Sequence, residues 1–470
     1  NMFKLTLAKL KAPFFLLLMV ILAYAIYIPW FGFYGDDWSY IWYQHLLGFG
    51  GSGDFAAYDR PFSSMYYNVV IALLGEAVWP YQVFAILLRW CSGVLAWLVL
   101  KKVWPRRAQQ SLWVAALFVL YPGFGQQPVS VEFILHFAVL DLFLLSLLIL
   151  LRSPGLPARR YWLLTVFSMF CTASLFALEY FIGLEILRLI FLWIVLAGTY
   201  PIYTERLKKT LQFWAPYGLV LALFLYWRVF VFKFPTYQPG LIRDLISNPI
   251  STLPSLIKRV VVDFKEVLLD AWQGMMRYPT GDLVKIYAVV LATGLICCLV
   301  YFYLLKDKNN VELDKDVSRK WWMGWHFQAA VIAVLSMLAA GLPFWVTGIP
   351  LEISFPWDRT TLPFMLGACL LLVVFVDLFI QPRFTPLVIS LLITASLGGH
   401  LMNAEVYHQE WEHMKSFYWQ LSWRAPALQP GTIIASDQIP LYKVSDSGMT
   451  APFNWTYAPD YHDRNLPYKV

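Results

Sequence analysis

The feature that most constrains this chain is a series of long apolar runs that recur from the N-terminal region to about residue 400. Runs of about 20 apolar residues are long enough for an α-helix to cross the hydrocarbon core of a bilayer. Only 14% of the residues are charged, against about 25% in a typical soluble domain, and 59% are hydrophobic. The sequence therefore predicts an all-α polytopic membrane protein.

We expect about eleven transmembrane helices. They are predicted over residues 12–31, 81–100, 111–121, 129–151, 161–177, 181–196, 211–232, 283–305, 325–345, 362–380 and 387–402. With this count every short loop rich in Lys and Arg, including the run Lys306–Lys320, falls on one side, as the positive-inside rule requires. Residues 1–402 are then the membrane domain, and residues 403–470 form a small non-cytoplasmic tail. Because the basic residues lie in short clusters between apolar runs, the net charge of +7 does not indicate a nucleic-acid partner.

Two segments leave alternatives open. Ser63–Leu74 is apolar but short, so it either lies along the interface with the rest of the first outer loop or begins a bent span. Residues 253–276 alternate charged and apolar side chains at helical spacing. This pattern indicates an amphipathic helix, either on the membrane surface or packed as a loop helix on the body.

A pair of carboxylates, Asp36 and Asp37, follows the first apolar run, where the chain should emerge from the bilayer. One interpretation is that they cap the next helix, as Asp does well. The other is catalytic, because carboxylates near hydrocarbon are costly and are usually kept for a function. Neighbouring residues on a helix point about 100° apart, so only one of the two can face a shared cavity. That one would act as a general base on an acceptor hydroxyl.

Three arginines are candidates for binding a donor phosphate. Arg359 opens the tenth predicted span at its outer end, and its fork of donors suits a phosphate. The alternatives are snorkelling and a pair with Asp358. Arg228 and Arg89 lie inside apolar runs near the outer face, and for both a structural partner in the bundle is an equal alternative.

Four further charged residues are candidates for contacting substrate. Asp59 and Arg60 follow one another before the second span and either pair with each other or meet the substrate. Glu179 lies in a tight apolar turn, which has little other reason to hold an acid. Glu132 and His136, at i and i+4 in the fourth span, could form half of a metal site. Nothing else in the sequence completes that site. Binding of a divalent cation therefore stays an open alternative, and no cofactor is assigned.

Nucleotide-dependent catalysis on the cytoplasmic side is not indicated. The sequence has no Walker pattern, no phosphate-cradling glycine loop and no Cys/His zinc array. An activated donor must then be one that a membrane protein meets on the outer side. A sugar carried on a polyprenyl phosphate meets this requirement.

The chain resembles the GT-C superfamily of integral-membrane glycosyltransferases, in its protein O-mannosyltransferase and aminoarabinose transferase-like branch. The resemblance rests on short motifs that keep their order and spacing relative to the predicted spans. They are Gly35-Asp36-Asp37-Trp38, Tyr58-Asp59-Arg60-Pro61-Phe62, Ala116-Leu117-Phe118-Val119-Leu120-Tyr121-Pro122, Leu178-Glu179-Tyr180 and Trp357-Asp358-Arg359. It covers about residues 13–380, and the tail resembles no family.

The resemblance implies an inverting transfer of a sugar from a polyprenyl-phosphate donor to a hydroxyl on a glycan, lipid or protein. Asp36 is the position that matches the family's catalytic acid, and Arg359 and Arg228 would stabilise the leaving phosphate. Relatives often carry His and Glu where Gln126 and Gln127 stand, which weakens any metal role there. We expect a monomer in the plasma membrane, in a bacterium the inner membrane, with its site on the periplasmic or extracellular side.

Two other function classes are consistent with these residues. A polysaccharide polymerase or ligase would use a lipid-linked oligosaccharide and a large outer loop rich in Arg, of which residues 233–282 are a modest version. A lipid or solute transporter would show two similar halves and ionisable residues near the midplane. The distinctive polar residues gather at one face and no repeat is visible, so the enzyme is the leading hypothesis.

Overall fold

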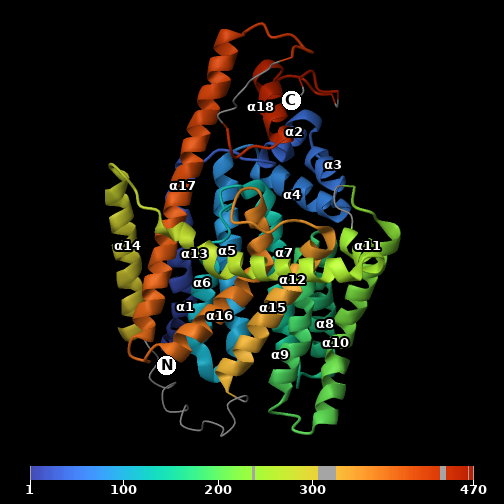
Figure 1. Ribbon diagram of the computed structural model, residues 1–470, viewed down its shortest axis with the longest axis vertical. Helices are drawn as coiled ribbons and strands as arrows, with labels where there is room; N and C mark the ends of the chain where they lie inside the picture. The colour runs from blue at the N-terminus through green and yellow to red at the C-terminus, as the bar shows by residue number, and fades with distance from the viewer. Residues whose placement is uncertain (1, 236–238, 305–323, 434–440, 464, 469–470) are drawn as a thin grey trace.

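The structure is a computed structural model that describes residues 2–235, 239–304, 324–433, 441–463 and 465–468 (Figure 1). All regular structure in these ranges is helical, and eight helices are long and apolar enough to cross a membrane. They contain α1 (Met2–Tyr24), α5 (Val78–Val103), α7 (Ser130–Arg152), α10 (Tyr203–Tyr226), α14 (Leu283–Leu299), α15 (Trp325–Thr347), α16 (Met365–Phe379) and α17 (Thr385–Arg424). The prediction of a polytopic helical membrane protein is confirmed at this level.

Three of the predicted spans correspond to shorter helices. Residues 111–121, 161–177 and 181–196 fall on α6 (Ala108–Val119), α8 (Ala158–Thr172) and α9 (Ile186–Leu196). Between α8 and α9 the chain continues in two 3-10 helices, η4 (Ala173–Phe176) and η5 (Glu179–Glu185). The apolar length read from the sequence is thus divided between α-helical and 3-10 turns, and a count of eleven crossing helices stays a prediction. The predicted cytoplasmic run Lys306–Lys320 lies outside the described residues.

A cluster of short helices caps the end of the bundle that is opposite the N-terminus (Figure 1). It consists of α2 (Asp37–Leu47), α3 (Gly51–Ala57) and α4 (Ser64–Leu74), which pack on one another. At 1.5 Å per residue α4 is about 17 Å long, roughly half of what a bilayer requires. The segment Ser63–Leu74 is therefore too short to cross the membrane by itself.

The segment predicted to be amphipathic is helical throughout. It forms α12 (Pro249–Lys265), the π-helix η7 (Glu266–Asp270), α13 (Ala271–Gln273) and the 3-10 helix η8 (Gly274–Met276), preceded by α11 (Gly240–Ser247). α12 runs across the bundle and not along it (Figure 1). Its apolar side chains Leu253, Ile257 and Val261 are exposed, while Val267 and Ala271 in the turns that follow are buried.

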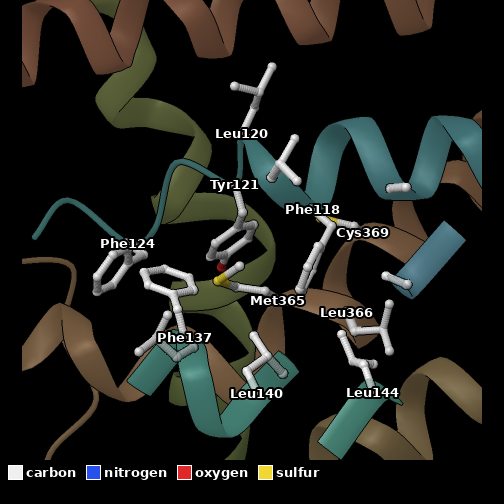
Figure 2. Close-up of a cluster of buried hydrophobic side chains, with 14 of the residues drawn as sticks. Phe118, Leu120, Tyr121, Phe124, Phe137, Leu140, Leu144, Met365, Leu366 and Cys369 are labelled. Atoms are coloured by element: carbon white, nitrogen blue, oxygen red, sulfur yellow. The ribbon is translucent and has the colours of Figure 1, made fainter. Parts of the chain in front are cut away.

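Side chains of α6, α7 and α16 meet in one part of the hydrophobic core. Figure 2 shows Tyr121 and Phe124, which follow α6, packed among side chains of α7 and α16 that include Phe137 and Met365. The Tyr121 hydroxyl donates to the carbonyl of Val267 at 2.7 Å. Between helices in a membrane such close packing, and not water exclusion, supplies most of the attraction. This core fixes where α7 and α16 begin, and the residues that precede these helices therefore have defined positions.

The last long helix joins the membrane bundle to the C-terminal tail. α17 has 40 residues, so it is about 60 Å long and extends well beyond a bilayer of about 30 Å. The predicted span 387–402 is its first part, and the expected domain boundary after residue 402 lies inside it. The tail then turns back, and its helix α18 (Asp446–Tyr457) packs on α2 (Figure 1).

Candidate functional site

A cavity of 590 Å³ lies where the capping helices meet the starts of α7, η5 and the 3-10 helix η13 (Trp357–Phe364). Five of the charged residues singled out in the sequence line it, namely Asp36, Asp59, Arg60, Glu132 and Arg359. The other lining residues are Tyr40, Tyr43, Leu47, Asp54, Phe55, Ala56, Tyr58, Ser63, Tyr67, Leu135, His136 and Tyr180. Segments separated by up to about 320 residues thus place two guanidinium groups and four carboxylates around one polar, aromatic-walled space.

Asp36 is the member of the acidic pair that lines the cavity. It occupies the N-cap position of α2, yet its side chain makes no capping hydrogen bond there. Instead, its Oδ1 accepts hydrogen bonds from the hydroxyls of Ser445 at 2.7 Å and Ser447 at 3.4 Å. The carboxylate is half-buried. It is therefore held from the tail and remains accessible from the cavity.

Asp37 has a different environment and is not among the lining residues. It is fully buried, and its Oδ1 accepts the backbone N–H of Glu132 at 2.8 Å. This contact satisfies one of the backbone donors that the first turn of α7 leaves without an intrahelical partner. Burial raises the pKa of the Asp37 carboxyl well above its ordinary value, and the neighbouring carboxylates of Glu132 and Asp36 act in the same direction. Of the two aspartates, Asp37 is therefore the one that caps a helix. The helix it caps is α7, and not α2, of which it is the first residue.

Asp37 also provides a stability prediction. Asp37→Ala should destabilise the fold by about 1–2 kcal/mol, because the N-terminus of α7 loses its acceptor. Asp37→Asn keeps the accepting oxygen and should remain close to the wild type in melting temperature. Thermal unfolding of the purified protein in detergent measures both, and equal melting temperatures for Asp37→Ala and wild type would contradict the capping role.

The pH dependence of the same variants gives an independent check. A carboxyl whose pKa is raised in the folded state binds more protons there than in the unfolded chain, so stability falls as pH rises. The fall begins near the ordinary pKa of about 4 and ends at the raised folded-state pKa. Melting temperatures across this window should fall less steeply with pH in Asp37→Asn than in wild type.

Two arginines line the cavity, and each faces a carboxylate. Arg359 Nη1 lies 3.5 Å from Glu132 Oε1, and Arg60 Nη2 lies 3.4 Å from Glu179 Oε1. Burial acts to lower the pKa of the Arg60 guanidinium, but Glu179, Tyr180 and Tyr40 together outweigh it and the pKa is raised. Both pairs are long for ion pairs with direct hydrogen bonds, which have distances near 2.8 Å. An anion entering the cavity would therefore meet two guanidinium groups whose contacts with Glu132 and Glu179 are longer than a direct charged hydrogen bond.

Asp358, the partner that one alternative gave to Arg359, makes its hydrogen bonds to the turn after α6. It is buried, and it accepts the backbone N–H of Gly125 at 2.8 Å and a hydrogen bond from the Gln126 amide. Gln126 also donates to the carbonyl of Pro356 at 3.0 Å. These contacts join the turn after α6 to the start of η13. They fix the backbone from which Arg359 extends toward Glu132.

The structure places Arg89 and Arg228 outside the cavity lining. Arg89 is fully buried, its Nε donates to the carbonyl of Val119 at 2.9 Å, and its guanidinium lies over the rings of Tyr24, Phe124 and Phe137. Arg228 donates to the carbonyl of Phe232 at 3.3 Å and lies over the Phe234 ring at 4.2 Å. Both arrangements correspond to the structural alternatives, with aromatic faces and backbone oxygens as partners.

Glu179 meets the cavity indirectly, through Arg60. It opens η5, whose close packing on α15 depends on a glycine, because a Cβ on Gly183 would lie 1.7 Å from the carbonyl oxygen of Ala339. Tyr180, the next residue, lines the cavity. As for metal, the described residues contain no group of three or more His, Cys, Asp or Glu side chains placed to hold an ion. The pair Glu132 and His136 gains no third ligand from them.

Sequence reasoning missed two parts of this site. The aromatic wall includes Tyr40 and Tyr67, whose rings stack with centroids 4.1 Å apart, and the Tyr67 hydroxyl donates to the carbonyl of Glu132 at 3.1 Å. In a chain with 18% aromatic residues no local signal separates these tyrosines from packing residues. The second part is Ser445, whose contact with Asp36 spans 409 positions.

Comparisons with known proteins place the chain in no family. No family model matches it, and no curated protein matches it.

Proposed function

We propose that this protein is an inverting glycosyltransferase that moves a sugar from a polyprenyl-phosphate donor to an acceptor hydroxyl on the outer side of the plasma membrane. The observation that carries the proposal is the meeting of the Asp36 carboxylate and the Arg359 guanidinium on one cavity. A general base and a binding site for a phosphate leaving group are the two parts that such a transfer requires.

In the proposed reaction the acceptor oxygen attacks the anomeric carbon from the side opposite the phosphate. The new carbon–oxygen bond forms as the bond from that carbon to the phosphate oxygen breaks, and its electron pair leaves with the phosphate. Asp36 takes the proton from the acceptor hydroxyl. The products are the glycosylated acceptor, inverted at the anomeric carbon, and a polyprenyl phosphate.

The arginines would act on the leaving group. Arg359 can present two parallel N–H donors to phosphate oxygens, and Arg60 supplies a second positive charge on the same cavity. In the structure Glu132 and Glu179 face these cations at 3.5 and 3.4 Å. An incoming phosphate would form shorter contacts with the two arginines than these carboxylates do. The positive charges that neutralise the phosphate are therefore already in place before the donor binds.

A lipid-linked donor suits a chain whose described part contains eight helices long and apolar enough to cross a membrane. The polyprenyl tail would remain among the helices while the sugar and phosphate enter the polar cavity. We place the protein in the plasma membrane with this cavity on the periplasmic or extracellular side, and we assign it to the GT-C type on the motif resemblance.

The direct test is mass spectrometry of the lipids that co-purify with the full chain, followed by an assay of polyprenyl phosphate release. We expect a polyprenyl phosphate or its sugar conjugate to be enriched over bulk phospholipid. Release of polyprenyl phosphate from a panel of polyprenyl-phosphate-linked sugars should require the protein and a membrane extract as the source of acceptors. If no panel member is consumed and no polyprenyl lipid is enriched, the proposal is wrong.

A further inference from the structure

The C-terminal tail reaches back to the proposed base. Ser445 donates its hydroxyl hydrogen to Asp36 Oδ1 at 2.7 Å, and its Oγ accepts the backbone N–H of Gly448 at 3.1 Å. Ser445 is thus the N-cap of α18 and a partner of Asp36 at the same time. With one bond given and one accepted, its side chain has a single orientation in which both are made.

The backbone just before Ser445 is held by hydrogen bonds from two other parts of the chain, the loop that carries Asp36 and helix α17. The backbone N–H of Gly35 donates to the carbonyl of Lys443 at 2.9 Å. From α17, the buried carboxylate of Glu410 accepts the backbone N–H groups of Tyr442 at 2.5 Å and Lys443 at 3.0 Å. Carboxylate–amide bonds of this kind are about twice as strong as neutral ones. The position of Ser445 is therefore set by a buried anchor and not by the Asp36 contact alone.

A close approach of two glycines completes the contact. A Cβ on Gly448 would lie 2.3 Å from the carbonyl oxygen of Gly35, the residue before Asp36. No side chain fits between the tail and the loop at this point. The tail backbone and the loop that carries the base therefore touch directly.

We propose that the tail segment 441–448 belongs to the catalytic apparatus, with Ser445 as the residue that positions the Asp36 carboxylate. This rests on the proposed function. Among the described residues both side-chain hydrogen bonds to Asp36 go to Oδ1, which leaves Oδ2 for the proton of the acceptor hydroxyl. A base that is held in one orientation meets its acceptor more often in a reactive geometry than one that rotates freely.

The experiment compares Ser445→Ala with Ser445→Thr in the full chain reconstituted in nanodiscs. We expect Ser445→Ala to lower the turnover number for polyprenyl phosphate release by about tenfold or more, the size of one hydrogen bond to a charged group. Binding of a polyprenyl phosphate without sugar should not change. Ser445→Thr keeps the hydroxyl and should restore most of the turnover, whereas Ser422→Ala, on the far part of α17, is the matched serine control.

A second variant separates positioning from folding of the tail. Glu410→Ala removes the anchor, so the amides of Tyr442 and Lys443 should exchange hydrogen faster. In Ser445→Ala these two amides should stay slow, because the amide that loses its acceptor there is that of Gly448. Wild-type turnover in Ser445→Ala would overturn the proposal, provided that Asp36→Asn is inactive. The proposal would also be overturned if Ser445→Ala loses turnover together with fast exchange at Tyr442 and Lys443, and Ser445→Thr does not restore the turnover. If Asp36→Asn is itself active, the proposed base is wrong and the failure lies with the proposed function.

Discussion

Asp36→Asn is expected to reduce sugar transfer by about a thousandfold, within the range of about 10²–10⁴ that a positioned general base contributes. Asparagine keeps the size of the side chain and an oxygen that can accept from the Ser445 hydroxyl. It cannot take up the proton of an acceptor hydroxyl. The measurement is the turnover number for polyprenyl phosphate release, with binding of sugar-free polyprenyl phosphate measured on the same preparation.

The control for this variant is Asp282→Asn, which changes an almost fully exposed carboxylate at the start of α14. We expect wild-type turnover from it. Asp36→Asn should bind the lipid phosphate as the wild type does, because its side chain is not part of the proposed phosphate site. Turnover within a few-fold of wild type in Asp36→Asn would remove Asp36 from the role of base.

Arg359→Ala is expected to weaken binding of polyprenyl phosphate by about a hundredfold. Two hydrogen bonds between a guanidinium and a phosphate are lost, and each bond to a charged group is worth about 1.5–3 kcal/mol. The release of Glu132 from its 3.5 Å contact with Arg359 offsets part of this cost. The measurement is equilibrium binding of a labelled polyprenyl phosphate to the protein in nanodiscs.

Two further variants make the arginine test specific. Arg359→Lys keeps one positive charge but cannot form the parallel pair of bonds, so its affinity should lie between those of wild type and Arg359→Ala. Arg424→Ala, an exposed arginine at the end of α17, should bind as the wild type does. Equal affinity in wild type and Arg359→Ala would exclude Arg359 from the phosphate site.

The sequence was sufficient for the helical membrane class, because apolar runs of bilayer length have few other uses. The spacing of charged and apolar side chains likewise predicted helical structure over residues 253–276, which the structure forms. The sequence did not give helix lengths. Residues 181–196, for example, begin inside the 3-10 helix η5 and only then enter α9. Hydropathy measures how apolar a stretch is, and it does not distinguish a 3-10 helix from an α-helix.

Most of the charged residues that line the cavity could be predicted from the sequence, but the role of each could not. The angle between neighbouring side chains predicted that one of Asp36 and Asp37 would face a cavity. Which one does so depends on α7, whose first turn takes Asp37 as its cap. Likewise, Arg89 and Arg359 are both phosphate candidates in the sequence, but one is enclosed by aromatic rings and the other lines the cavity. Such differences arise from contacts between distant segments, which a single sequence does not record.

The length of α17 has a consequence for how the bilayer acts on this protein. The first part of α17 is predicted to span the bilayer, and the same continuous helix carries Glu410, which holds the tail. A helix embedded in this way changes its tilt when the hydrocarbon layer becomes thinner or thicker. A change of tilt by a few degrees displaces the far end of a helix about 60 Å long by several ångströms, which would make the proposed catalysis sensitive to lipid chain length.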